Sequence, residues 1–168
     1  LFTEDVDLTD VEWISIDGTK YTNTIIGNGY AIKGLNAPLF STTSASVKAL
    51  HFEDVDITSN DVVEVGAFAG VVTATDEVVP TISNCSVRGQ LKMDNPTLTG
   101  VDPRLGALVG TSHGVAFDGC VNYATVTAPK VYASGSTNVF LGGIAGITYP
   151  YTKSDKTVVY STVHNSKN

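Results

Sequence analysis

The sequence predicts an all-β protein built from stacked repeats, a parallel β-solenoid of about four coils. The first reason is a six-residue segment framed by glycines, which occurs as 65–70, 105–110 and 141–146. The second is a pair of apolar positions, three residues apart, that recurs between these copies. The third is composition, because charged residues make up only 16% of the chain, against about 25% in typical globular domains.

Residues 1–36 are predicted to be an N-terminal capping segment that leads into the repeats. Its stretch 11–16 alternates polar and apolar residues, as a half-buried strand does. Residues 37–168 are predicted to hold the stacked repeats. Because no linker divides the chain, we expect a single domain over 1–168. The last repeat, at 160–165, is followed by only three residues, so we expect the chain to be a fragment of a longer one.

The Gly-framed segment is predicted to form one wall of the solenoid. A degenerate earlier copy at 37–41 places Leu39 where the complete copies have Phe68, Leu108 and Ile144. These apolar residues are expected to fill the interior. The framing glycines are expected to relieve crowding where the chain bends or the wall packs closely.

The second motif predicts two ladders of side chains, with parallel strands about 4.8 Å apart. One ladder is expected to contain Phe52, Ile82, Phe117 and Tyr160. The other is expected to contain Val55, Cys85, Cys120 and Val163. Connections of unequal length are predicted as loops at 73–80, 94–104, 128–138 and 149–157.

Cys85 and Cys120 are predicted to be free thiols in the apolar interior, because Val55 and Val163 share their position. A disulfide remains the alternative, since neighbouring rungs would bring the two Cα atoms about 5 Å apart.

Charge and composition exclude several function classes. The net charge is −7 and the chain has only ten Lys and Arg, so nucleic-acid binding is not expected. No apolar run approaches about 18 residues, so no transmembrane segment is predicted. No catalytic, cofactor-binding or metal-binding residue is predicted, and no cofactor is expected. Calcium binding at Asp5, Asp7 and Asp10 is left open, although the spacing is not that of a 12-residue calcium loop.

Tyrosines in predicted loops are the candidate ligand-contact residues: Tyr132, Tyr149 and Tyr151. Exposed tyrosine rings stack on sugars or anchor protein partners. The alternative is that these rings pack over the outer wall of the solenoid itself.

The order of the motifs resembles the GLUG-type repeat proteins of bacterial surfaces. The resemblance rests on the segments 5–8, 13–16 and 27–35 in that order, on the three Gly-framed copies, and on 82–85 and 120–122. Ile26 stands where the family has Asp, and Ala37 and Ser41 replace the glycines of the first copy. The resemblance implies a right-handed parallel β-helix and a secreted or surface-anchored module, often part of a larger adhesin or peptidase-associated protein. It implies no catalytic residue.

From these observations we expect a protein that is not an enzyme, serving as a bacterial extracellular or cell-surface scaffold or adhesion module. Its expected partners are glycans or host and matrix proteins, and its open C-terminal edge is expected to pair with further repeats or another chain. The alternatives are a carbohydrate-active β-helix enzyme, a lyase or glycosidase, and a purely structural spacer in a larger surface protein.

Overall fold

The computed structural model describes residues 1–60, 62–94, 102–128 and 138–168. These residues form short β-strands and contain no helix. The strands are β1 (Val6–Asp7), β2 (Ile16–Gly18), β3 (Thr24–Ile26), β4 (Ala31–Lys33), β5 (Phe40–Thr43), β6 (Ser46–Lys48), β7 (His51–Ser59), β8 (Glu64–Val65), β9 (Ala69–Thr73), β10 (Thr81–Ser83), β11 (Ser86–Met93), β12 (Arg104–Gly106), β13 (Val109–His113), β14 (Ala116–Asp118), β15 (Val121–Asn122), β16 (Thr125–Thr127), β17 (Phe140–Gly142), β18 (Ala145–Tyr149), β19 (Tyr151–Thr152), β20 (Val158–Val159) and β21 (Thr162–His164).

Most strands belong to four parallel sheets, which confirms the all-β class and the parallel pairing. Sheet 1 has the order β1-β4-β7-β11-β15, with β16 beside β11. Sheet 2 has the order β8-β12-β17, sheet 3 the order β2-β5-β9-β13-β18, and sheet 4 the order β3-β6-β10-β14-β21. The chain visits the sheets in numerical order and then returns to sheet 1, so successive passages add strands to the same sheets. Sheet 2 has no strand from the first two passages.

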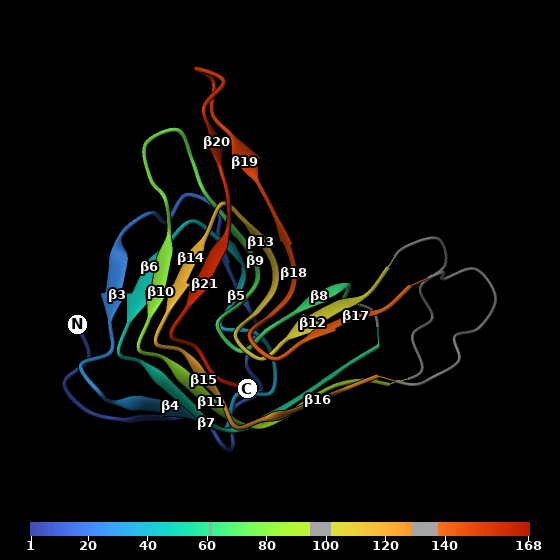
Figure 1. Ribbon diagram of the computed structural model, residues 1–168. Coiled ribbons are helices and arrows are strands. Elements are labelled where there is room, and N and C mark those ends of the chain that lie inside the picture. Colours follow the sequence, from blue (N-terminus) through green and yellow to red (C-terminus); the bar gives the residue numbers. More distant parts are fainter. Residues whose placement is uncertain (61, 95–101, 129–137) are drawn as a thin grey trace.

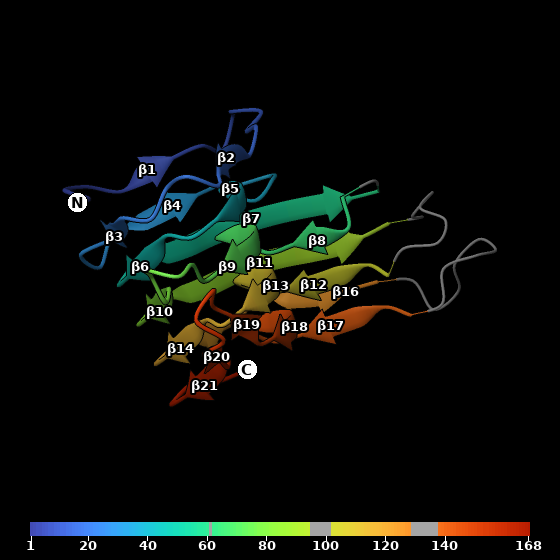
Figure 2. The ribbon, with the colours of Figure 1, turned by 90° about the horizontal axis from the view of Figure 1, so that it is seen from above.

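Successive passages lie side by side from the N-terminal to the C-terminal end (Figure 2). In Figure 1, which is viewed at right angles to Figure 2, sheet 1 lies below sheet 2, and sheets 3 and 4 rise beside each other. Their inward side chains form one apolar core, in which Phe52, Phe68 and Phe117 are fully buried. The lead-in residues 1–36 contribute terminal strands to sheets 1, 3 and 4, and Trp13 packs against the core.

The first predicted ladder is partly present. Ile82 pairs with Phe117 in parallel register. The ladder continues through Val47 on one side and Val163 on the other. Phe52 and Tyr160, which were expected in these two positions, lie outside the ladder.

Phe52 pairs with Val87 in sheet 1, five residues further along the passage than predicted. Tyr160 precedes β21 and its side chain is 69% exposed. The error has a simple cause: Val47 and Leu50 have the same three-residue spacing as Phe52 and Val55, and all four are buried. Spacing alone fits either pair, and only the backbone register distinguishes them.

The cysteine ladder shows the same shift. Cys85 and Cys120 occupy neighbouring rungs, because Val121 N–H donates to the Cys85 carbonyl and Ser86 pairs with Val121. Val55 pairs with Gly89 and Val163 with Phe117, so neither belongs to the cysteine ladder as predicted. The positions on either side of the cysteines are those of Leu50 and Ser166, which directly precede the paired residues His51 and Lys167. Both cysteines are free and buried, which confirms the thiol prediction.

The Gly-framed segment forms the bend between sheets 2 and 3. Leu105 pairs with Val65 and Leu141, as the repeat predicts. Phe68 N–H donates to the Leu108 carbonyl, and Leu108 N–H donates to the Ile144 carbonyl, so these three residues stack as predicted. Leu39 joins them, because its successor Phe40 pairs with Ala69, the successor of Phe68.

A second recurrent bend, between sheets 4 and 1, uses the left-handed backbone conformation. Ala49, Asn84, Gly119 and Asn165 follow one another in register, with φ of 49°, 52°, 63° and 48°. Gly and Asn tolerate this conformation at low cost. This explains why a small or polar residue precedes each cysteine.

The predicted loops differ in outcome. Residues 73–80 connect β9 to β10, whereas 149–157 contains most of an antiparallel hairpin made by β19 and β20. The predicted loops 94–104 and 128–138 lie largely outside the described residues. The part of the chain that the structure describes has no helix long and apolar enough to cross a membrane.

Candidate functional site

Tyr149, a predicted ligand-contact residue, belongs to a cluster with Glu64, Arg104 and His113, which we call the Tyr149 cluster. Tyr149 ends β18 and pairs in register with His113 of β13. Their rings stack with centroids 5.1 Å apart and planes inclined by 20°. The Arg104 guanidinium lies 5.9 Å from the Tyr149 ring centroid. Strand pairing therefore holds this ring in place, whereas the sequence predicted a loop.

The charges of the Tyr149 cluster are paired across sheet 2. Arg104 and Glu64 lie in register on β12 and β8, and Arg104 Nη1 donates to Glu64 Oε1 over 2.8 Å. The pKa of His113 is lowered, first by burial and then by the positive charge of Arg104, while Glu64 acts in the opposite direction. The structure therefore favours an uncharged imidazole against the Tyr149 ring.

Two buried polar atoms at the cluster have no hydrogen-bond partner among the described residues. They are Arg104 Nε and the hydroxyl oxygen of Thr111, a residue only 1% exposed. Thr111 precedes His113 by two residues on β13. Arg104 thus has an N–H donor within the cluster that is not used, and Thr111 has an unused hydroxyl on the strand that carries His113.

Tyr151 lies in the hairpin, which projects beyond the four sheets (Figure 1). Its hydroxyl donates to Asp76 Oδ1 over 3.3 Å, and Ser154 N–H donates to the same oxygen over 3.0 Å. Lys153 Nζ donates to the Asp76 carbonyl over 2.8 Å. Desolvation and the nearby Asp76 carboxylate raise the pKa of Tyr151. The predicted loops at 73–80 and 149–157 are therefore joined to each other. Tyr132 lies outside the described residues.

A recess of about 390 Å³ lies on the outer face of sheet 1, where it meets the bend from sheet 4. It is lined by His51, Glu53, Asn84, Cys85, Ser86, Arg88, Gly119, Val121 and Tyr123. His51 Nδ1 and Ser86 Oγ are 2.8 Å apart and hydrogen-bonded. The Arg88 guanidinium lies 4.0 Å above the Tyr123 ring centroid.

A second recess, of about 290 Å³, lies at the last rung and is lined by Asn122, Ala124, Val126, Leu141, Gly142, Gly143 and Asn168. Asn122 Nδ2 donates to Asn168 Oδ1 over 2.6 Å across this end. Leu141 is 48% exposed and Val163 is 53% exposed. The final strands therefore present apolar side chains at the C-terminal end of the stack.

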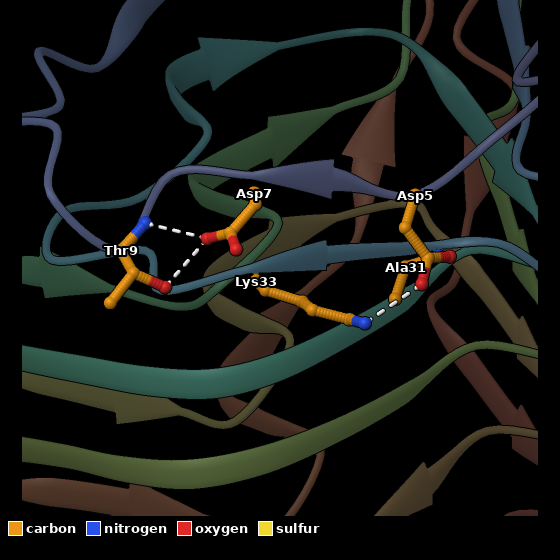
Figure 3. A network of polar contacts seen from close by, with 5 residues as sticks. All are labelled: Asp5, Asp7, Thr9, Ala31 and Lys33. Atoms are coloured by element: carbon orange, nitrogen blue, oxygen red, sulfur yellow. Dashed lines mark hydrogen bonds and ion pairs between the residues drawn. The ribbon is translucent and has the colours of Figure 1, made fainter.

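The N-terminal aspartates are engaged in hydrogen bonds within the chain (Figure 3). Asp5 accepts from Lys33 Nζ over 2.8 Å and from Ala31 N–H over 2.9 Å. Asp7 accepts from the Thr9 hydroxyl over 2.6 Å and from Thr9 N–H over 3.0 Å. The hydrogen bonds from Lys33 and from Thr9 are the main causes that lower the pKa of Asp5 and of Asp7, respectively. These contacts tie β1 to β4 and shape the turn that follows β1.

No set of metal ligands forms in the described residues. They contain no group of three or more His, Cys, Asp or Glu side chains that could hold a metal ion. The histidines, at positions 51, 113 and 164, do not have the spacing of a zinc-binding His-Glu-x-x-His helix. Of the neighbouring residues Ser112 and His113, Ser112 contacts the Ser161 hydroxyl, while the His113 ring stacks on Tyr149.

Sequence reasoning missed Arg104, Glu64, Arg88 and Tyr123 as site residues. A signal existed for the first pair: Glu64 and Arg104 both stand two residues before the first glycine of a Gly-framed copy. Opposite charges at the same repeat position indicate a cross-strand ion pair. For Arg88 and Tyr123 no such signal existed, because Arg88 lies where the register of β11 and β7 is interrupted.

One family model matches residues 4–89, slightly more than half of the chain: the M26 IgA1-specific metallo-endopeptidase N-terminal region. No curated protein and no solved structure matches the chain. The expectation that the protein is not an enzyme is contradicted by this match, which makes the chain peptidase-related, although the match is to an N-terminal region. The described residues form no group of side chains that fits the metal ion implied by the family description. Because the match covers this share of the sequence, the chain belongs to the family of M26 IgA1-specific metallo-endopeptidase N-terminal regions.

Proposed function

We propose that the four sheets are the faces of a right-handed parallel β-solenoid of the GLUG type, and that this solenoid is a scaffold and adhesion module of a peptidase-related bacterial surface or secreted protein. Two features support the solenoid. The chain visits the sheets in a constant order, and every pairing within them is parallel. The family match to a peptidase N-terminal region supports the placement in a larger protein.

The module presents the Tyr149 cluster and the adjoining hairpin to a glycan or protein partner outside the cell. The single observation that carries this proposal is the fixed orientation of the Tyr149 ring, which is stacked on His113 and lies near Arg104. An aromatic ring that is already ordered binds a partner without a large loss of side-chain entropy. Arginine and tyrosine are also among the residues that contribute most to binding at interfaces.

Direct binding tests this function. The chain is immobilised and exposed to IgA1, which the family description suggests as the first protein to try, and then to matrix proteins and a glycan array. We expect one of these partners to bind, and Tyr149→Ala to weaken binding by about tenfold or more, as removal of an interface anchor does. Tyr160→Ala is the matched control, since Tyr160 is exposed and lies outside the cluster.

Absence of binding to every partner would leave the structural-spacer alternative as the better account. Equal losses for the Tyr149 and Tyr160 variants would show that binding does not use the cluster. The carbohydrate-active enzyme alternative draws little support from the two recesses: Glu53 is the one carboxylate residue lining them, whereas glycoside hydrolysis needs a pair about 5–10 Å apart.

A further inference from the structure

The recess on the outer face of sheet 1 is separate from the Tyr149 cluster, and its lining follows the rungs. β7 contributes His51 and Glu53, and β11 contributes Ser86 and Arg88. On the next rung, the recess is lined by Val121 of β15 and by Tyr123, which directly follows that strand. Three successive rungs, about 4.8 Å apart, therefore carry polar and aromatic side chains on one face.

Arg88 is prepared to bind an anionic group. Its guanidinium lies 4.0 Å above the Tyr123 ring, and within the described parts of the chain it forms no ion pair. The stack fixes the plane of the guanidinium. The N–H groups along the edge of a guanidinium can bind a carboxylate with two parallel hydrogen bonds.

The neighbouring side chains offer both donors and acceptors. His51 uses Nδ1 in its bond to Ser86, and its other ring nitrogen has no bond to a described residue. Glu53 pairs in register with Lys33, whose positive charge offsets that of the carboxylate. Glu53 is thus suited to accept hydrogen bonds from hydroxyl groups beside a bound anion.

The backbones of β7 and β11 are not free to pair with an extended peptide. Strands β7 and β11 are paired on both sides, in the order β4-β7-β11-β15. An extended peptide cannot add a strand to an edge that is already paired. At β7 and β11 a ligand is therefore met by side chains, and a volume of about 390 Å³ lies within the range of small-molecule sites.

We propose that this recess binds an acidic sugar, such as a hexuronate or a sialic acid. The sugar carboxylate pairs with Arg88, and its hydroxyl groups bond to His51, Ser86 and Glu53. Asn84 and Gly119 line the recess in close contact with each other, because a Cβ at Gly119 would lie 2.5 Å from Asn84 Oδ1.

The test is a titration of the ¹⁵N-labelled chain followed by NMR, with glucuronate and N-acetylneuraminate as probes. Glucose serves as the neutral sugar, and acetylglutamate methylamide serves as a carboxylate without a sugar ring. We expect one or both acidic sugars to shift the amide signals of Ser86, Arg88 and Tyr123. Glucose and the glutamate derivative should each bind at least about tenfold more weakly, since each lacks one of the two sets of contacts.

The variants separate the Arg88 contact from a general charge effect. Arg88→Gln should weaken binding of the acidic sugar about tenfold or more, as loss of a charged hydrogen-bond partner does. Lys92→Gln removes the same charge from the same strand but outside the recess, where Lys92 pairs with Asp94, and should change binding less than about twofold. If Arg88→Gln does not fold, Arg88→Lys keeps the charge and should still weaken binding, because it loses the bidentate fork.

Three results would overturn the proposal. The first is an affinity for glucose equal to that for the acidic sugars, and the second is an equal affinity for the glutamate derivative. The third is the absence of amide shifts with either acidic sugar at about 20 mM, a concentration at which binding with a Kd of about 1 mM is nearly saturated. Failure here would leave the Tyr149 test unaffected, since the two sites lie on different sheets.

Discussion

His113 is a residue whose charge state depends on the neighbours that the fold gives it. Burial and Arg104 lower its pKa, and Glu64 partly opposes them. Because the folded state holds the proton less tightly than the unfolded chain, protonation costs stability. The stability contributed by uncharged His113 is fully present above the pKa of the unfolded chain, near 6.5. It is lost as the pH falls from that value through the lower pKa of the folded state.

We therefore expect the chain to lose thermal stability as the pH is lowered from about 7 to 5. His113→Gln keeps a planar polar group against Tyr149 but does not titrate, so its melting temperature should fall less over the same interval. Melting curves followed by circular dichroism at several pH values measure both. His164→Gln is the control, since His164 is exposed, and it should follow the parent chain. Parallel curves for the parent and His113→Gln would contradict the assignment.

The bend between sheets 2 and 3 explains which Gly-framed copies need their glycines. A Cβ at Gly110 would lie 2.5 Å from Val65 N and 2.8 Å from Gly70 O, so the two sheets approach closely there. Ser41 occupies the same position in the second passage, because Phe40 and Ala69 are paired. That passage has no strand in sheet 2, and Ser41 is exposed. The sequence departure at Ser41 is therefore tolerated, because no strand of sheet 2 lies beside it and its hydroxyl donates to the Ile16 carbonyl.

Gly110→Val should lower the free energy of unfolding by about 2–3 kcal/mol through overpacking. Ser41→Val, the matched substitution, should change it by no more than about 0.5 kcal/mol. Urea denaturation of the two variants measures the difference. Similar losses would mean that the close approach at the bend is not what requires glycine.

The hairpin of β19 and β20 is an element held to the body through one carboxylate. Asp76 accepts from the Tyr151 hydroxyl and from Ser154 N–H, linking the β9–β10 connection to the hairpin. Among the described residues, a further hydrogen bond between the hairpin and this connection runs from Lys153 Nζ to the Asp76 carbonyl. Local opening there therefore depends on Asp76 more than on global stability.

Asp76→Ala should leave global unfolding nearly unchanged but raise local opening of 151–159, at about 1 kcal/mol per hydrogen bond lost. Hydrogen exchange of the amides of residues 151–159 measures this local opening. Glu77→Ala removes a neighbouring carboxylate that makes no side-chain bond to the hairpin among the described contacts and should leave exchange unaltered. Unchanged protection in Asp76→Ala would show that the hairpin is held by other means.

Across the whole molecule, stability comes from stacking each passage on its neighbours, and the cysteine ladder lies inside that stack. Cys85 and Cys120 are no more than 1% exposed. A hydrogen bond to Cys120 and burial raise the pKa of Cys85. A buried thiol with a raised pKa reacts slowly, since the thiolate is the reactive form.

Both thiols should resist a disulfide reagent such as DTNB until the stack unfolds, because both are buried out of reach of the reagent. Their reactivity should rise over the same range of urea concentration in which circular dichroism reports loss of the sheets. Cys85→Val should fold, because Leu50 is an apolar residue in the same ladder. Rapid labelling of either thiol without denaturant would show that the passages open separately.

Much of the architecture follows from the sequence by itself. The three complete Gly-framed copies predicted their own stacking, and Leu39 was correctly placed with them, because repeated backbone bends demand repeated small residues. The all-β class, the parallel pairing and the free cysteines also follow from repeated short-range patterns. The tertiary structure alone decided the register of Phe52, Tyr160, Val55 and Val163, since two apolar pairs with identical spacing compete for each position. It also decided the sites: Arg104 meets Tyr149 and Arg88 meets Tyr123 only because stacking brings residues from different passages within contact distance, and no local pattern encodes that distance.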